Sequence, residues 1–384
     1  MLSKSVRLKG FKKKISSKKI KTIYKKLLNS KSEVLNSLSS NYHYSFNKKN
    51  LSKYKKNKYF RVIGMGGSTL GSQAIYDFLK HRIKKNFLFI DNLKLSQKNE
   101  KKNFTNLVIS KSGNTIETIV NANILIKNKD KNIFITEDKN SYLKLLANKL
   151  KAEIIDHNNF IGGRYSVLSE VGMLPAELMG LDSNKFKQIN SLIKNKQFEN
   201  SLLSNVAASL YYLKKKKFNS IIINYDEKSE NLFKWYQQLV AESLGKKNKG
   251  ILPIVSIMPR DNHSVMQLYL DGFKHNFFTF FYVKEKNSDR LFNNNILSAK
   301  NYLKNKDVNK IIYAQKKATE NVFKKKNIPF RSFELDNRDE KSLGELFCFF
   351  ILETILIGRA LKIDPYNQPA VELIKKETKK LLVS

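Results

Sequence analysis

A single cysteine, Cys348, occurs in this chain of 384 residues. One thiol excludes an intrachain disulfide framework and any metal site built from several cysteines. It is compatible with a reducing compartment, so we expect a cytoplasmic protein. Histidine is also scarce, and the five histidines show no metal-ligand spacing. We therefore expect no zinc site.

Long apolar runs are missing as well. The most apolar stretch, residues 343–361, contains Glu345, Glu353 and Arg359. It therefore predicts a buried helix and not a membrane span, which needs about 20 apolar residues. The N-terminal region lacks the apolar core of a secretory signal. We expect residues 1–50 to form a polar, solvated helical leader, and a transit peptide or a surface-binding helix is the alternative.

Acidic residues are few, with 33 Asp and Glu against 72 Lys and Arg, and the formal charge is +39. Such a charge is typical of proteins that bind nucleic acid or an anionic membrane. Here, however, lysine predominates over arginine and is spread along the whole chain. Specific nucleic-acid readers usually rely on arginine forks and stacked aromatic rings. We favour compositional drift, as an AT-rich coding sequence would produce, and expect no specific nucleic-acid partner.

Short apolar segments alternate with helical ones from residue 59 onward. This βαβα order predicts α/β domains built on parallel sheets with helices on both faces. The order restarts near residue 219, after an expected linker at 180–205 rich in Asn, Ser and Lys. The predicted strands are 59–64, 87–91, 106–110, 132–136, 152–156, 220–224, 253–258, 277–283 and 331–335.

Two similar α/β units follow from this restart. We expect a helical segment at 1–50, a first domain at 51–195, a second domain at 196–360 and a helical tail at 361–384. The hydrophobic content of 41% is sufficient for two separate cores.

Two loops after predicted strands are rich in glycine and hydroxyl groups. Residues 64–71 read GMGGSTLG and include Gly67 and Ser68, and residues 108–120 read VISKSGNTIETIV. Ligands of open parallel sheets lie beyond the carboxyl ends of the strands. Glycine lets the backbone approach a ligand, and a helix N-terminus attracts an anion. Together the loops predict a site for a phosphate monoester, with further donors at Ser110, Lys111, Ser112 and Thr115.

Other interpretations of these loops remain open. A dinucleotide fingerprint needs a third glycine where Thr69 stands, although Asp91 is placed like a ribose-binding acid. A P-loop needs lysine where Ser72 stands. Either loop alone would also fit ordinary helix capping by serine and threonine.

A helix over residues 231–244, ended by Gly245, carries a candidate base. Gln238 and Glu242 are four residues apart and therefore share a face. The alternative is an exposed glutamate without a role.

Three further residues are candidates for chemistry. Arg164 follows two glycines in GGRYS, and its guanidinium could stabilise an oxyanion or fix the loop through a salt bridge. His263 lies in a polar loop after a strand, where a surface histidine is the alternative. Lys375, in NQPAVELIKK, could equally be one more solvated lysine.

Six stretches, in order over residues 60–380, resemble the phosphoglucose isomerase family. They are GMGGSTLG, VISKSGNTIET, GGRYSVLSEVGMLP, QQLVAESLGK, DNHSVMQLYLDG and NQPAVELIKK. The resemblance implies two sugar isomerase (SIS) domains of α/β/α sandwich type. It also implies a homodimer with a shared active site, and the interconversion of glucose 6-phosphate and fructose 6-phosphate without metal or nucleotide.

The resemblance assigns roles to residues of this chain. Glu242 corresponds to the base that moves a proton between C1 and C2, and Arg164 to the group that stabilises the enediolate. His263, from the neighbouring subunit, and Lys375 correspond to the ring-opening residues. The phosphate cradle corresponds to Ser68, Ser110, Lys111, Ser112 and Thr115, and the sugar contacts to Gln238 and Gln368.

Two alternatives remain for function. The form SKSGNTIET is also seen in bifunctional glucose/mannose phosphate isomerases, so mannose 6-phosphate is a second possible substrate. A non-catalytic SIS regulator that senses a sugar phosphate would explain the loops and the charge. It would leave Glu242, Arg164 and His263 without a function.

Overall fold

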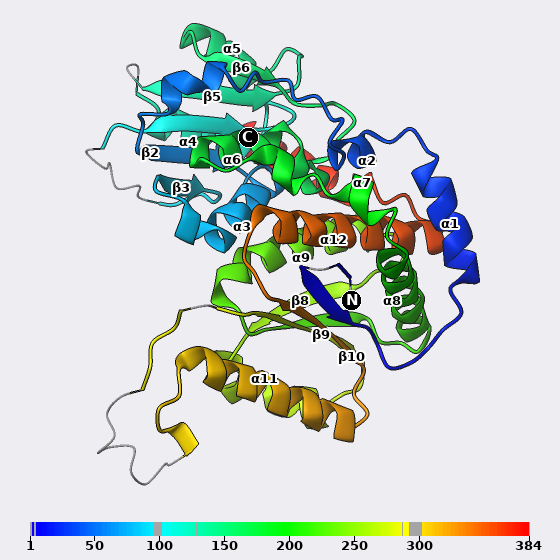
Figure 1. The fold of residues 1–384 in the computed structure, drawn as a ribbon. Coiled ribbons are helices and arrows are strands. Elements are labelled where there is room, and N and C mark those ends of the chain that lie inside the picture. Colours follow the sequence, from blue (N-terminus) through cyan, green and yellow to red (C-terminus); the bar gives the residue numbers. More distant parts are fainter. Residues whose placement is uncertain are drawn as a thin grey trace.

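Two five-stranded sheets organise the chain (Figure 1). The computed structural model describes residues 2–3, 5–95, 102–127, 130–285, 287–291 and 302–383. The first sheet has the strand order β3-β2-β4-β5-β6 and is parallel throughout. Its strands are β2 (Tyr59–Gly64), β3 (Asn86–Ile90), β4 (Thr105–Ile109), β5 (Lys131–Thr136) and β6 (Glu153–Asp156).

The second sheet has the order β1-β10-β9-β7-β8, and all its pairs are parallel except β1 with β10. All nine strands expected from the sequence are confirmed, with ends that agree within one residue. The α/β class with parallel sheets is confirmed with them. The strands of this sheet are β1 (Val6–Lys9), β7 (Asn219–Asn224), β8 (Leu252–Ile257), β9 (Asn276–Val283) and β10 (Phe330–Leu335).

Helices cover both faces of each sheet. The larger ones are α1 (Lys18–Leu28), α3 (Leu70–Phe78), α4 (Ile116–Leu125), α5 (Tyr142–Lys149), α6 (Glu170–Met179), α8 (Lys196–Lys214), α9 (Glu230–Leu244), α11 (Val308–Lys325), α12 (Glu340–Ala360) and α13 (Pro369–Val383). The shorter ones are α2 (Glu33–Ser37), α7 (Ile189–Leu192) and α10 (Met266–Asp271).

The described residues form three apolar cores, which hold these layers together. Successive strand residues point to opposite faces, so Ile63 packs with α4 and α5 while Val62 faces the central core. That central core runs between the sheets and includes α3, α9 and α12. A third core places Phe323 of α11 against Phe278 and Phe280 of β9. Strands buried on both faces explain the continuous apolar runs in the sequence.

The N-terminal segment differs from the expected solvated leader. Residues Val6–Lys9 form an edge strand against β10, and Val6 is fully buried. On α1, Ile20, Tyr24 and Leu27 are buried, and this helix packs against α8 and α12. The prediction was wrong because it was based on the many lysines of this segment. The apolar residues, spaced three to four apart on one face of α1, are the ones that pack against the core.

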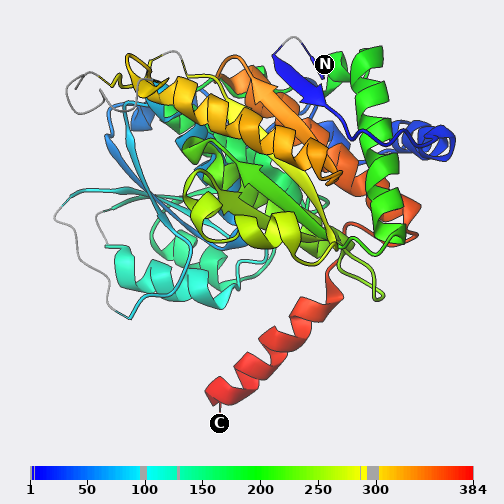
Figure 2. The same ribbon diagram turned by 90° about the horizontal axis from the view of Figure 1, so that it is seen from below.

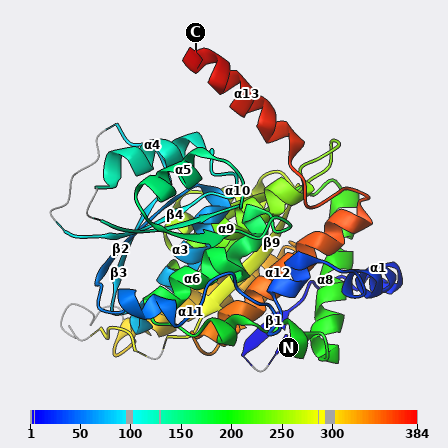
Figure 3. The same ribbon diagram turned by 90° about the horizontal axis from the view of Figure 1, so that it is seen from above.

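The stretch 180–205 is structured and is not an open linker. It contains α7 and the start of α8, with Phe186, Leu192 and Phe198 buried. By contrast, α13 projects away from the rest of the chain and has no buried residue (Figures 2 and 3). No helix in the described part of the chain is long and apolar enough to cross a membrane.

Candidate active site

The glycine loop after β2 makes close backbone contacts with two other parts of the chain. Gly66 has a φ of +53°, and a Cβ there would lie 2.7 Å from Nε2 of Gln238 on α9. A Cβ on Gly67 would lie 2.1 Å from the carbonyl carbon of Gly163. Only glycine lets α9 and the loop that carries Arg164 approach the end of β2 this closely.

The serine loop lies beside the glycine loop because β2 and β4 are paired, with Gly64 opposite Ile109. Oγ of Ser110 lies 2.9 Å from Oγ1 of Thr115. Thr115 is the N-cap of α4, but its side chain makes no capping hydrogen bond. The first N–H groups of α4 therefore add to an anion-attracting end, as the sequence predicts.

The other polar side chains of the predicted cradle lie in the same two loops. Ser112 is exposed, and its Oγ accepts from the N–H of Asn114 at 3.2 Å. The ammonium group of Lys111 donates to the carbonyl of Asn159 at 2.8 Å. Ser68 is half-buried in the 3-10 turn Gly66–Ser68 of the glycine loop. Hydroxyl, ammonium and amide donors thus gather beyond two neighbouring strands of the first sheet.

Arg164 is the most connected side chain of the site and is 2% exposed. Its Nη1 donates to Oε2 of Glu242 at 3.1 Å and to Oε1 of Gln368 at 2.7 Å. Its Nη2 donates to the carbonyls of Pro365 at 2.7 Å and Asn367 at 3.1 Å. A fixed guanidinium fork matches this set of acceptors, which one lysine ammonium could not reach together.

Glu242 is not a solitary surface glutamate. Besides Arg164 at Oε2, its Oε1 accepts from Nε2 of Gln238 at 2.9 Å, as two residues on one helix face can. Its side chain is 28% exposed, so it is held in place and still reaches open space. The structure thus brings together four predicted residues from three distant segments: Arg164, Gln238, Glu242 and Gln368.

Three residues of this cluster were not among the predicted site residues. Ser243 accepts from Nε of Arg164 at 2.9 Å and lies 2.8 Å from the hydroxyl of Tyr165. Burial raises the pKa of Tyr165 to about 12, so it remains a neutral donor. Burial and then the charge of Arg164 lower the pKa of Lys246. The only sequence signal was proximity, since Tyr165 directly follows Arg164, Ser243 directly follows Glu242, and Lys246 lies four residues after Glu242.

The cluster does not include the other two predicted catalytic residues. His263 is exposed in a short 3-10 turn, Arg260–His263, after β8. Lys375 lies on α13, is exposed, and donates to Glu372 at 2.7 Å. Within the described residues, no three His, Cys, Asp or Glu side chains are arranged to hold a metal ion.

The arrangement pairs a carboxylate that can take a proton with a cation that can stabilise an anion, next to a phosphate-type cradle. The phosphoglucose isomerase family matches residues 52–384 of the chain. The chain belongs to this family.

Several known proteins are similar to this chain in sequence or in fold. A glucose-6-phosphate isomerase of Methanocaldococcus jannaschii is 35% identical over 349 residues, which cover 85% of this chain and 86% of that protein. A hypothetical protein of Thermus thermophilus has a similar fold, with a TM-score of 0.83, 21% identity and 95% of each chain covered. A glucose-6-phosphate isomerase of Chlamydia trachomatis superposes with a TM-score of 0.70 and 18% identity, and the superposition covers 87% of this chain and 72% of that chain.

Membership of the phosphoglucose isomerase family agrees with the resemblance read from the sequence. The family's match begins at residue 52, after β1 and α1. The matched residues include the glycine loop, the Arg164–Glu242 pair and α13. They also include every strand of the two sheets except the edge strand β1.

Proposed function

We propose that the protein interconverts glucose 6-phosphate and fructose 6-phosphate in the cytoplasm. One observation carries the proposal, namely the contact of Glu242 with both Arg164 and Gln238 at the edge of the glycine loop. A sugar-phosphate sensor would not need a carboxylate paired with a buried guanidinium. This pairing counts against the non-catalytic alternative.

Proton transfer and charge movement are coupled at this pair. Glu242 removes the proton from C2 of the open-chain sugar and becomes neutral, and the negative charge then lies on O1 of the enediolate, to which Nη1 of Arg164, released from the neutral carboxyl, donates. Glu242 then returns the proton to C1 while the proton of the C2 hydroxyl passes to O1, which gives the ketose. The buried guanidinium therefore faces one negative charge before and after the transfer, which stabilises the transition state with little reorganisation.

The remaining residues bind and open the sugar. Ser68, Ser110, Ser112 and Thr115, with the N-terminus of α4, hold the phosphate, and Lys111 adds positive charge. The phosphate does not react, and its binding fixes the reacting carbons beside Glu242. Gln238 and Gln368 contact the sugar hydroxyls.

We also infer a homodimer that completes the site. His263 is exposed and lies outside the Arg164 cluster, so it is available to the site of a neighbouring subunit. Lys375 lies on a helix that projects from its own chain. Both residues act in ring opening once a second subunit is bound.

The deciding experiment is a coupled assay of fructose 6-phosphate turnover without added metal. Glu242→Gln keeps the size of the side chain but cannot take the proton. We expect kcat to fall by about 100- to 10,000-fold, the range of general base catalysis. Glu230→Gln, on the first turn of the same helix, is the matched control and stays within about two-fold, as surface changes do.

Two results would contradict the proposal. One is wild-type protein without turnover, and the other is Glu242→Gln with undiminished turnover. Mannose 6-phosphate in the same assay tests the wider substrate range.

A further inference from the structure

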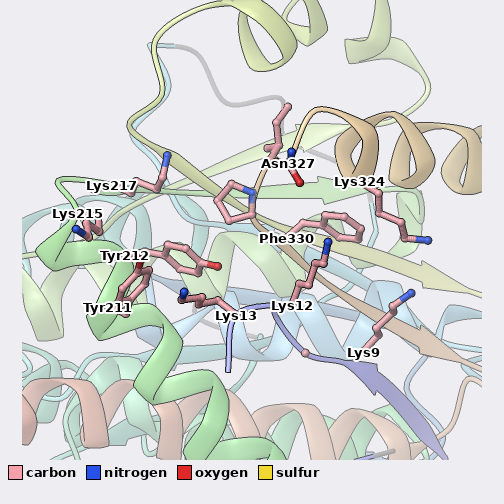
Figure 4. A pocket seen from close by; sticks show the side chains of 13 residues that line it. Lys9, Lys12, Lys13, Tyr211, Tyr212, Lys215, Lys217, Lys324, Asn327 and Phe330 are labelled. Atoms are coloured by element: carbon pink, nitrogen blue, oxygen red, sulfur yellow. The ribbon is translucent and has the colours of Figure 1, made fainter. Parts of the chain in front are cut away.

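A second cavity of about 810 Å³ lies away from the candidate active site. Three distant segments line it: the chain after β1, the end of α8, and the turn between α11 and β10 (Figure 4). It shares no residue with the Arg164 cluster or the phosphate cradle. Its volume falls in the range of about 300–1,000 Å³ that is typical of small-molecule sites.

Positive charge is concentrated at this cavity. Of the described residues, 13 line the cavity, and six of these are lysines while none is Asp or Glu; in the chain as a whole, 72 of 384 residues are lysine or arginine. Uniform compositional drift does not explain this enrichment. Among the described residues, none of the six forms an ion pair. The six are Lys9, Lys12, Lys13, Lys215, Lys217 and Lys324.

Lysine side chains that lie close together without acidic neighbours create a positive potential, and a bound anion would lower their mutual repulsion. The ammonium group of Lys217 donates to the carbonyl of Lys274, and burial followed by the charge of Lys274 lowers its pKa. Lys13 lies 5.9 Å from the ring centre of Tyr211 and has no carboxylate partner among the described residues. The fold thus tolerates repulsion here that neighbouring acids could have removed.

Aromatic rings form much of the apolar wall of the cavity, together with Ile328 and Pro329. Tyr211 is half-buried at its wall, and Tyr212 packs on Phe277 with ring centres 5.9 Å apart. Phe330 is half-buried at the start of β10 and packs edge-on against Phe280. Figure 4 shows Tyr212 and Phe330 among the lysine side chains. Rings fixed by such packing offer flat surfaces on which a planar group can stack.

We propose that this cavity binds a nucleoside triphosphate. The triphosphate carries several negative charges in one compact group, which matches six lysine side chains that form no ion pair with a described residue. The base supplies the planar ring that the aromatic wall fits. A hexose phosphate has one phosphate and no planar ring, so it matches neither feature.

Calorimetric titration of the whole protein with ATP, at about 0.15 M salt to screen weak surface attraction, tests the proposal. We expect saturable binding of one ATP per chain. The double variant Lys12→Gln/Lys215→Gln is expected to bind at least ten-fold more weakly. Lys149→Gln/Lys194→Gln removes the same charge from exposed positions elsewhere and should bind like wild type.

Ring recognition is tested separately with Tyr211→Leu. This variant should lose about ten-fold in ATP affinity, as expected for one stacking contact, and bind inorganic triphosphate like wild type. Tyr211→Phe should retain ATP binding. Thermal unfolding and isomerase assays on each variant show whether it is folded, independently of ligand binding.

Several results would overturn the proposal. These are ATP binding that the lysine changes leave intact, inorganic triphosphate binding as tightly as ATP, and equal binding of glucose 6-phosphate at this cavity. Tighter binding of single-stranded RNA than of ATP would assign the surface to a polymer. Because the readout is binding at a separate cavity, failure here leaves the isomerase proposal unaffected, and the reverse also holds.

Discussion

At the level of single residues, Arg164 links the chemistry to the fold. Its guanidinium contacts a helix of the second unit through Glu242 and Ser243, and the segment before α13 through Pro365 and Gln368. The sequence predicted an arginine with an oxyanion or a loop-fixing role. The structure contains the loop-fixing contacts, and the proposed chemistry uses one of the same nitrogens.

Arg164→Lys should therefore impair both folding and turnover. Lysine keeps the charge but cannot donate to five acceptors in fixed directions. We expect kcat to fall by about 100-fold or more, as when a preorganised donor is removed, together with a lower Tm. Arg359→Lys, at a half-buried position on α12, is the control in the same assays. Equal behaviour of the two variants would exclude the proposed role of the fork.

A second residue-level prediction concerns Lys187, which is 7% exposed. Its ammonium group donates to the carbonyls of Ser37 and Leu168 and lies 4.8 Å from the ring centres of Tyr42 and Tyr44. Burial lowers its pKa to about 7.

Between pH 7 and the ordinary lysine pKa of about 10.4, the unfolded chain binds more protons at Lys187 than the folded chain. Folding stability contributed by this residue therefore rises with pH in that window, and is constant below it. Relative to Lys187→Met, the wild-type free energy of unfolding should gain about 1.4 kcal/mol per pH unit. Urea unfolding of both proteins across the window measures the difference, and parallel profiles would refute it.

At the level of elements, buried ion pairs join helices to strands. Arg331 on β10 is 1% exposed and makes two contacts with Glu353 on α12, one of them at 3.0 Å. Its Nε also donates to Thr279 of β9 at 3.0 Å. These contacts fix α12 over the second sheet.

Breaking this pair from one side leaves a buried charge without a partner. Glu353→Leu should lower the free energy of unfolding by about 3–5 kcal/mol. The double variant Arg331→Met/Glu353→Leu should recover most of the loss, because no charge is left buried. Urea unfolding of the single and double variants measures the free energies. If the single variant lost stability only through poorer packing, the second substitution would not restore it.

The elements also show what the sequence could and could not predict. Runs of mainly apolar residues identified nine strands, because most positions of a strand covered on both faces are buried. The strand β1 was missed because it has four residues, with Arg7 and Lys9 on its exposed face, and its partner lies near the other end of the chain.

Part of the reason for the glycines was likewise outside the sequence. The glycine loop was predicted to let the backbone approach a phosphate, and the structure adds that Gly66 and Gly67 leave room for Gln238 and Gly163. Motif order identified Arg164, Glu242, Gln238 and Gln368 as candidates, but their convergence depends on packing between the two sheets. The lysine-lined cavity could not be predicted, since its three segments meet only in the fold.

For the whole molecule, α13 is the feature that one chain leaves incomplete. Val371, Ile374, Leu381 and Leu382 lie on one face of this helix and are 41%, 69%, 77% and 70% exposed. An apolar stripe of this kind on a projecting helix is typical of a surface that another chain covers.

We expect Ile374→Lys/Leu381→Lys to shift the protein from dimer to monomer in light-scattering measurements. Turnover of fructose 6-phosphate should fall as the dimer is lost, because His263 and Lys375 then lack a second subunit on which to act. Lys376→Ala/Lys379→Ala alters exposed positions on the same helix and should leave the mass unchanged. A wild-type monomer with full activity would contradict the shared-site arrangement.

The pairing of β1 with β10 also has a consequence for biosynthesis. Val6 is opposite Leu335, so the ribosome exposes β1 long before its partner strand has been made. The first sheet has all its strands by residue 156 and can form while translation continues, since domains fold as units during synthesis. Throughout that time the nascent chain keeps Val6 and Leu8 without their final neighbours, a period in which a chaperone would find them accessible.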